Sequence, residues 1–152
     1  MSVSTNNNGG SIAPNYNNAL LQIGINYAMT ATAKSGFAFT NWTDGDSNVV
    51  TNNPTLRFLM APGLAFTANF ADIAKPTVSI TNLSLNPRSG SLVSNEFFTV
   101  KGRASDNVAV ASVYYILNDA TNYLPAATEN NWTNWSADLD LKPGANALGV
   151  VA

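Results

Sequence analysis

The chain has 152 residues, of which 45% are hydrophobic and only 11% are charged, and its net charge is −2. This hydrophobic fraction supports a packed core in one domain or two small ones, and it argues against global disorder. The absence of cysteine and histidine excludes disulfides, thiolate chemistry and the Ser-His or Cys-His pairs of hydrolases. The seven basic residues are scattered, and no apolar run reaches the ~18 residues of a transmembrane helix, so we expect neither nucleic-acid binding nor membrane insertion.

The two ends of the chain differ in character. Residues 1–10, MSVSTNNNGG, are polar and predict a flexible lead, and they lack the apolar segment of a signal peptide. Either an export signal precedes this sequence, or Met1 is not native. The last residues, Leu148 to Ala152, form an apolar run without a turn or a polar tail. We therefore expect a fragment of a longer protein whose last strand is incomplete.

Between residues 11 and 73, apolar and polar side chains alternate with a period of two, which predicts β-strands rather than helices. Lys34-Ser35-Gly36 is predicted to be a hairpin turn, and residues 43–54 a long polar connection. The apolar side chains expected to share strand faces are Tyr27, Met29, Ala31, Ala33, Phe37, Phe39, Leu56, Phe58, Met60, Leu64, Phe66, Ala68 and Phe70.

A second set of strands follows a break near Asp72 to Pro76 and occupies residues 74–152. Short strands separated by Gly, Pro, Asn and Asp turns are typical of a β-sandwich. The side chains expected to face its core are Val78, Ile80, Phe98, Val100, Val113, Tyr115, Leu117, Trp135, Ala137, Leu139, Leu141, Leu148, Val150 and Ala152.

An acidic loop is the candidate metal site. Asp44, Asp46 and Asn48 repeat the first alternating ligands of a calcium loop, but the glycine and glutamate positions of such a loop are not filled. Two interpretations stay open: a looser Ca²⁺ site that includes Asp44 and Asp46, or a turn in which these side chains bond to their own backbone. Asp106 and Asn107 predict a turn between strands, and the alternative is a Ca²⁺ site that Asp106 forms with a carboxylate at the module junction such as Asp72. No other cofactor is expected.

Asp138 and Asp140 form the one acid pair that resembles a catalytic arrangement. Two residues along a strand place the carboxylates ~7 Å apart, which is not far from the separation in retaining glycosidases. A catalytic pair also needs a cleft and one raised pKa, and the outer face of a strand supplies neither. We therefore expect a solvated strand face and no catalytic residue.

Outward aromatic and apolar side chains are the best candidates for contact with a ligand or partner. Strand parity places Trp135 in the core and leaves Trp132 outside it, and it turns Phe97, Tyr114 and Ile116 outward. Exposed aromatic rings can stack on sugars, whereas an outward apolar sheet face is usually covered. The apolar face could be covered by the first module, by another subunit or by a ligand, and we favour packing between modules.

The first module resembles the divergent InlB B-repeat family of bacterial surface proteins, over about residues 10–71. The resemblance is carried by four segments, which are Tyr27 to Ala33 (YAMTATA), Gly36 to Trp42 (GFAFTNW), Asn53-Pro54 and Thr67 to Phe70 (TANF). The glycine that usually follows the tryptophan is displaced to Gly45. The resemblance implies that residues 11–73 form a small β-grasp-like module with a non-catalytic repeat role.

The second module looks like a bacterial Ig-like or fibronectin III-like domain, over about residues 76–152. The resemblance is carried by Pro76 to Ile80, Phe98 to Gly102, Ala104 to Ser112 and Asn134 to Ala152. Such domains normally continue into a V-x-A-x-D-x-x-G-N segment, and Ala152 precedes it. The resemblance implies an Ig-like β-sandwich and transfers no binding residue.

Together these features predict an all-β, non-enzymatic fragment of an exported bacterial protein, located at the cell surface or in the extracellular matrix. Its expected role is spacing, display or adhesion, with neighbouring modules of the same parent protein as partners. One alternative is a carbohydrate-binding region of a polysaccharide-acting enzyme, with surface glycans bound at an exposed Trp132. Another is a self-assembling subunit in which a second copy completes the open last strand.

Overall fold

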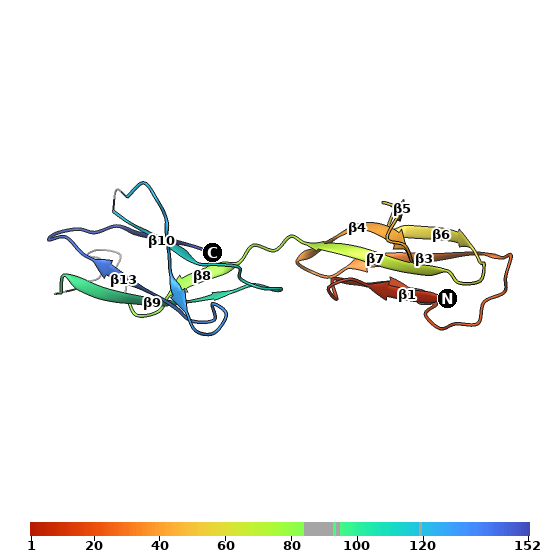
Figure 1. Cartoon of the computed structure of the whole chain (residues 1–152), viewed down its shortest axis with the longest axis horizontal. Coiled ribbons are helices and arrows are strands. Elements are labelled where there is room, and N and C mark those ends of the chain that lie inside the picture. The colour runs from red at the N-terminus through yellow and green to blue at the C-terminus, as the bar shows by residue number, and fades with distance from the viewer. Residues whose placement is uncertain (84–92, 94, 119) are drawn as a thin grey trace. The chain divides into compact units, whose positions relative to one another are not determined.

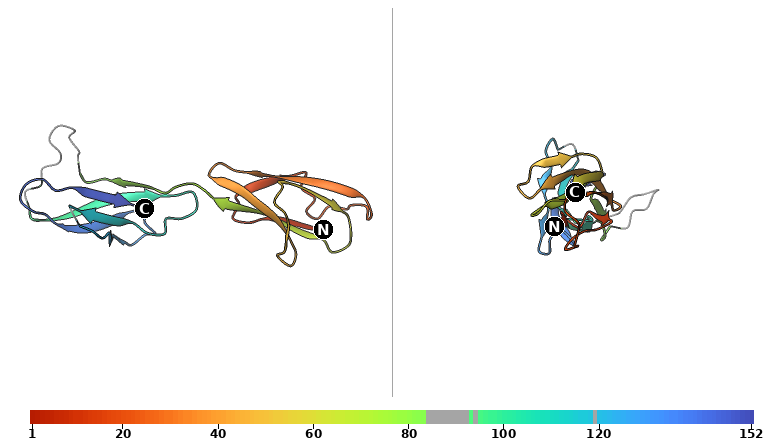
Figure 2. Two further views of the ribbon diagram at one scale, coloured as in Figure 1. Left: turned by 90° about the horizontal axis from the view of Figure 1, so that it is seen from above. Right: turned by 90° about the vertical axis from the view of Figure 1, so that its right-hand side faces the viewer.

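A computed structural model describes residues 1–83, 93, 95–118 and 120–152 of the chain. These residues divide into two compact units, Met1–Ala74 and Lys75–Ala152, and each unit has its own hydrophobic core. Every regular element in the described residues is a β-strand (Figures 1 and 2), which confirms the predicted all-β class. The first unit ends at residue 74, where the sequence placed the end of the first module at residue 73.

The first unit is a sandwich of two sheets. One sheet has the order β1-β7-β4-β5 and consists of β1 (Ser2–Thr5), β7 (Ala65–Asp72), β4 (Phe37–Asp44) and β5 (Val49–Thr51). The other has the order β2-β3-β6 and consists of β2 (Gly10–Ala13), β3 (Asn26–Ala33) and β6 (Thr55–Leu59). All neighbouring strands are antiparallel except β1 and β7, which are parallel.

The inward side chains of both sheets meet in one core, because successive residues of a strand point to opposite faces. Trp42 is fully buried at its centre, and the Trp42 Nε1 donates to the Pro54 carbonyl oxygen at 3.0 Å. The buried side chains are Val3, Met29, Ala31, Trp42, Leu56, Phe58, Met60, Phe66, Ala68 and Phe70. Apart from Val3 and Trp42, all of them lie on the strand faces predicted from the alternation.

The prediction of a flexible lead over residues 1–10 is wrong. β1 pairs with β7, so that Val3 lies opposite Phe66 and is only 5% exposed. The Asn6 side chain then continues the ladder: its Oδ1 accepts from the Phe70 N–H at 2.6 Å and its Nδ2 donates to the Phe70 carbonyl at 3.2 Å. Polar composition was a poor guide here, because an amide side chain can satisfy backbone groups as a strand does.

Two further expectations for the first unit are corrected. Lys34-Ser35-Gly36 turns the chain, and the Phe37 N–H donates to the Lys34 carbonyl at 3.1 Å. However, β3 and β4 lie in different sheets, so the turn joins the two layers and is not a hairpin. The β-grasp-like arrangement, which packs a helix on one sheet, is also replaced, because in residues 1–74 the second layer is a second sheet.

The second unit is the predicted β-sandwich. One sheet has the order β12-β13-β9-β8 and consists of β12 (Ala127–Thr128), β13 (Trp135–Asp140), β9 (Phe97–Ser105) and β8 (Thr77–Ile80). The other has the order β11-β10-β14 and consists of β11 (Leu124–Pro125), β10 (Tyr114–Leu117) and β14 (Leu148–Val151). In immunoglobulin nomenclature the first sheet corresponds to strands D, E, B and A, and the second to C′, C and F.

The core of the second unit confirms the predicted inward set, with one exception. Trp135 is 2% exposed and lies opposite Gly102 in the β13–β9 ladder, where its ring fills the space that a side chain at Gly102 would occupy. The buried side chains are Val100, Ala104, Val113, Ala126, Trp135, Ala137 and Leu139. The exception is Ala152, which is exposed because β14 ends one residue earlier, at Val151.

Candidate functional site

The side chains predicted to contact a ligand or partner do not meet on one surface. Phe97 lies on β9 and is 72% exposed, whereas Tyr114 and Ile116 lie on β10. These strands belong to different sheets, and the inward side chains of both sheets pack into the shared core. Outward side chains on two packed sheets point in opposite directions. Phe97 and Tyr114 therefore do not form one flat platform.

Trp132 is more exposed than Trp135, in agreement with strand parity, but its ring is not free. It is half-buried and packs against the core cluster of the second unit. The Trp132 N–H donates to the Thr128 Oγ1 at 3.0 Å, which ties the loop before β13 to β12. These contacts give Trp132 a structural role in holding this loop.

The acidic loop is organised by hydrogen bonds to Asp44. The Asp44 Oδ1 accepts from the backbone N–H of Asn48 at 2.9 Å and from that of Asp46 at 3.0 Å, so Asp44 closes a turn at the end of β4. Asp106 lies in the other unit, where its Oδ1 accepts from the Val108 N–H at 3.0 Å. Each of these two candidate metal sites is thus a turn that an aspartate side chain closes on its own backbone, and the described residues hold no group of three metal-binding side chains.

Acidification is expected to destabilise the first unit through Asp44. The backbone N–H of Asn48 is the main cause that holds the pKa of the Asp44 carboxyl below its ordinary value of 3.8. A lowered pKa means that the stabilisation is fully present above about pH 4 and is lost as the pH falls through the pKa of the folded state. Asp44→Asn keeps a side-chain oxygen that accepts the same hydrogen bonds, and it should remove this part of the pH dependence.

The measurement is the melting temperature of the first unit between about pH 6 and pH 2.5. Asp46→Asn is the matched control, because Asp46 lies in the same turn and its side chain is exposed. We expect the control to behave like the parent chain. An unchanged acid response in Asp44→Asn would contradict the role given to Asp44.

Asp138 and Asp140 occupy the exposed face of β13, as predicted. The Thr99 Oγ1 donates to the Asp138 Oδ1 at 2.6 Å across the sheet, and Asp140 lies opposite Phe97. Asp138 therefore links two neighbouring strands of the sheet, and Asp140 lies on the same exposed face.

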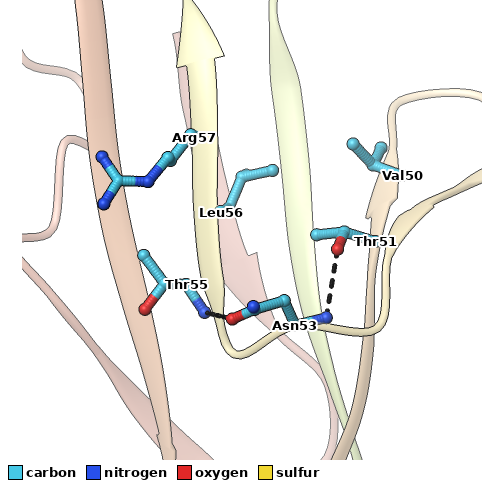
Figure 3. A pocket seen from close by; sticks show the side chains of 6 residues that line it. All are labelled: Val50, Thr51, Asn53, Thr55, Leu56 and Arg57. Atoms are coloured by element: carbon cyan, nitrogen blue, oxygen red, sulfur yellow. Dashed lines mark hydrogen bonds between the residues drawn. The ribbon is translucent and has the colours of Figure 1, made fainter.

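A groove lies along one side of the first unit, between β5 and β6 (Figure 3). It has a volume of about 510 Å³ and is lined by Val50, Thr51, Asn53, Thr55, Leu56 and Arg57. β5 and β6 are the outermost strands of their sheets, so the sandwich is open along this side. Leu56 is 1% exposed and forms the floor of the groove, while the Arg57 side chain extends on the opposite side of β6 (Figure 3).

The turn between β5 and β6 closes one end of the groove and is anchored to the core. The Asn53 N–H donates to the Thr51 Oγ1 at 3.0 Å, and the Thr55 N–H donates to the Asn53 Oδ1 at 2.8 Å. The carbonyl of Pro54, between them, accepts from the buried Trp42 indole. The groove thus has a fixed floor and a fixed end. Its lining combines the apolar Val50 and Leu56 with polar residues and Arg57, beside the outer edges of β5 and β6.

Sequence reasoning missed this groove, because residues 43–54 were interpreted as a polar connection. The segment contains β5, and the signal was the apolar pair Val49-Val50 within polar surroundings. Val49 is 59% and Val50 is 45% exposed. Only the pairing of β5 with β4 places this pair beside β6.

The geometry defines the class of the protein as two β-sandwich modules in series. Residues 1–74 match the family model of the divergent InlB B-repeat domain, and residues 76–150 match that of the bacterial Ig domain. The chain is therefore a divergent InlB B-repeat domain followed by a bacterial Ig domain, as the resemblance predicted. Neither the curated proteins nor the solved structures compared with the chain include a match.

Both families are typical of structural modules in bacterial surface or extracellular proteins, and such modules are typically non-catalytic. Within the part of the chain that the structure describes, no helix could cross a membrane.

Proposed function

We propose that this chain is a non-catalytic spacer that displays other parts of an exported protein at the bacterial cell surface. The observation that carries the proposal is the separation of the two cores: each cluster of buried side chains draws all its members from one unit. A module that completes its own core can be added to a chain without a new interface. Such modules extend a protein by simple repetition.

The polar surface of the modules supports a role outside the cell. Pairs of hydroxyl groups link neighbouring strands, as between Ser4 Oγ and Thr67 Oγ1 and between Thr30 Oγ1 and Thr55 Oγ1, both at 3.0 Å. Neutral pairs of this kind are not screened by salt, unlike exposed ion pairs. The low charge content of 11% therefore favours a fold that tolerates changes in ionic strength.

Single-molecule stretching of the intact chain tests the spacer role. Two independent units should give two separate unfolding events, each lengthening the chain by about 25 nm, from roughly 75 residues at ~3.4 Å each. A single cooperative event of about twice this length would contradict the proposal. So would turnover of a polysaccharide by the purified chain.

A carbohydrate-binding role is less well supported by the same structure. Sugar stacking needs aromatic rings that face one side. Phe97 and Tyr114 lie on different sheets, and Trp132 packs against the core.

Self-assembly is a second candidate function, because β14 has backbone groups that its pairing with β10 does not use. β14 is the end strand of its sheet, and its sequence, Leu148-Gly149-Val150-Val151, holds neither a charge nor a proline to protect the edge. The Asn118 N–H donates to the Ala147 carbonyl at 2.6 Å. Since bonded residues alternate, the backbone groups of Leu148 and Val150 point away from β10. A strand from another copy can pair with them.

Sedimentation over a range of protein concentrations tests this candidate. We expect association in the parent chain and a monomer in Val151→Lys, because Val151 is 42% exposed and a lysine on an edge strand opposes pairing. A parent chain that stays monomeric at every concentration would remove self-assembly from consideration.

A further inference from the structure

We propose that the free edge of β6 binds an extended peptide of a partner protein by strand addition, and that Arg57 selects a peptide with a carboxylate opposite it. The inference goes beyond the spacer role, because it assigns a binding site to the first unit. It rests on the hydrogen-bonding groups of β6, on the unpaired Arg57, and on the groove between β5 and β6, in which Val50 and Leu56 are the apolar side chains.

β6 uses only half of its backbone groups within its own sheet. The Met60 N–H donates to the Ile25 carbonyl at 2.9 Å, so Met60 and, two residues earlier, Phe58 face β3. Bonded residues alternate in an antiparallel ladder. The N–H and C=O groups of Arg57 and Leu59 therefore point away from β3, toward the open side. A row of such groups is the template for an added strand.

Of the two strands that border the groove, β6 is the better template. β5 has only three residues, and the register of its ladder with β4 shifts between Trp42 and Thr43. Short and irregular edge strands resist pairing. β6 has five residues in continuous register with β3, from Thr55 to Leu59, so its free edge is long and regular.

Arg57 gives this edge its charge preference. It is one of the two basic residues of the first unit, with Lys34, and its side chain is exposed. Its cross-strand neighbour on β3 is Ala28, which cannot neutralise it. Within the described residues the guanidinium has no hydrogen bond or ion pair. A residue opposite Arg57 on an added strand would lie about 5.5 Å away between Cα atoms, so a glutamate or aspartate there can pair with Arg57.

The residues on either side of this carboxylate would face inward. Side chains alternate along a strand, so these neighbours enter the groove between Val50 and Leu56. Val50 and Leu56 are the two apolar side chains among the six residues that line the groove, so apolar side chains of a bound peptide would pack against them. The partner therefore has an extended segment in which a carboxylate is flanked by apolar side chains.

The test uses the intact chain and a fluorescein-labelled probe peptide, acetyl-VTVEVTV-amide. In the free protein we expect fast amide hydrogen exchange at Arg57 and Leu59 and slow exchange at Phe58. Of these three residues, only Phe58 has an N–H group that points to β3. Binding of the probe should slow exchange at Arg57 and Leu59. Absence of binding would overturn the proposal, and so would binding that protects Leu148 and Val150 in the second unit instead.

Three protein variants and a modified probe separate the contributions of charge and of backbone hydrogen bonds to binding. Arg57→Gln should weaken binding about two- to fivefold, as for an exposed ion pair, while Lys34→Gln, the matched control, should leave it unchanged. Arg57→Glu should prefer a probe with lysine in place of glutamate. A probe with N-methylated glutamate keeps the carboxylate but cannot donate to the Arg57 carbonyl, so it should not bind. Equal binding of all probes by all variants would show that neither Arg57 nor strand addition is involved.

Discussion

Replacing Trp135 with alanine is expected to destabilise the second unit by about 3–5 kcal/mol, which is the usual effect of deleting a large core aromatic side chain. Trp135 is 2% exposed and lies in the β13–β9 pair at the centre of its sheet. Its ring packs directly on Gly102, which has no side chain of its own to fill the space that the ring would leave. The cavity would therefore remain open.

Trp132→Ala is the matched control for this prediction. Trp132 has the same side chain but is only half-buried, at the border of the same cluster. We expect a loss of less than half that of Trp135→Ala. Calorimetric melting measures both variants, and the transition of the first unit should not move, because its core shares no residue with the second. Equal losses in the two variants would show that the strand register is wrong.

Gly10→Ala is expected to destabilise the first unit by about 3 kcal/mol, at the upper end of the usual effect of overpacking. A Cβ at Gly10 would overlap the Phe70 ring and would also approach the Thr32 carbonyl oxygen too closely. The backbone of β3 holds that oxygen in place, so a change of side-chain rotamer cannot relieve the contact.

Gly45→Ala is the control for Gly10→Ala. Only the Ala65 Cβ, at 3.3 Å, lies within 4 Å of the added methyl group at Gly45. We expect an effect near zero at Gly45 and a clear loss at Gly10 in urea denaturation of the intact chain. The comparison also tests the start of the chain: if residues 1–10 were the flexible lead that their composition suggests, Gly10→Ala would be neutral.

The candidate site could be predicted from sequence only in part. The acidic turn was recognisable, because Asp44 and Asn48 are residues that bond to nearby backbone. The alternation also predicted that Phe97 and Tyr114 point outward. It could not predict that they lie on different sheets, because alternation shows only on which face of its own strand a side chain lies. The groove beside Arg57 was not predicted at all, since it lies between two strands that do not pair with each other.

The sequence by itself determined the all-β class, the strands with clear alternation and their buried faces, the break between the modules and both families, but not β1 and β5. These features are local. Alternation of apolar and polar residues indicates which face of a strand is buried, and a proline together with a change of pattern indicates a boundary between modules. Tertiary structure alone decided which strands are neighbours. It paired Ser2–Thr5 with β7, more than sixty residues away, and it sent the turn at Lys34-Ser35-Gly36 from one sheet to the other. Strand pairing depends on contacts between residues far apart in the chain, so the position of β6 at the end of its sheet becomes apparent only when both sheets are assembled.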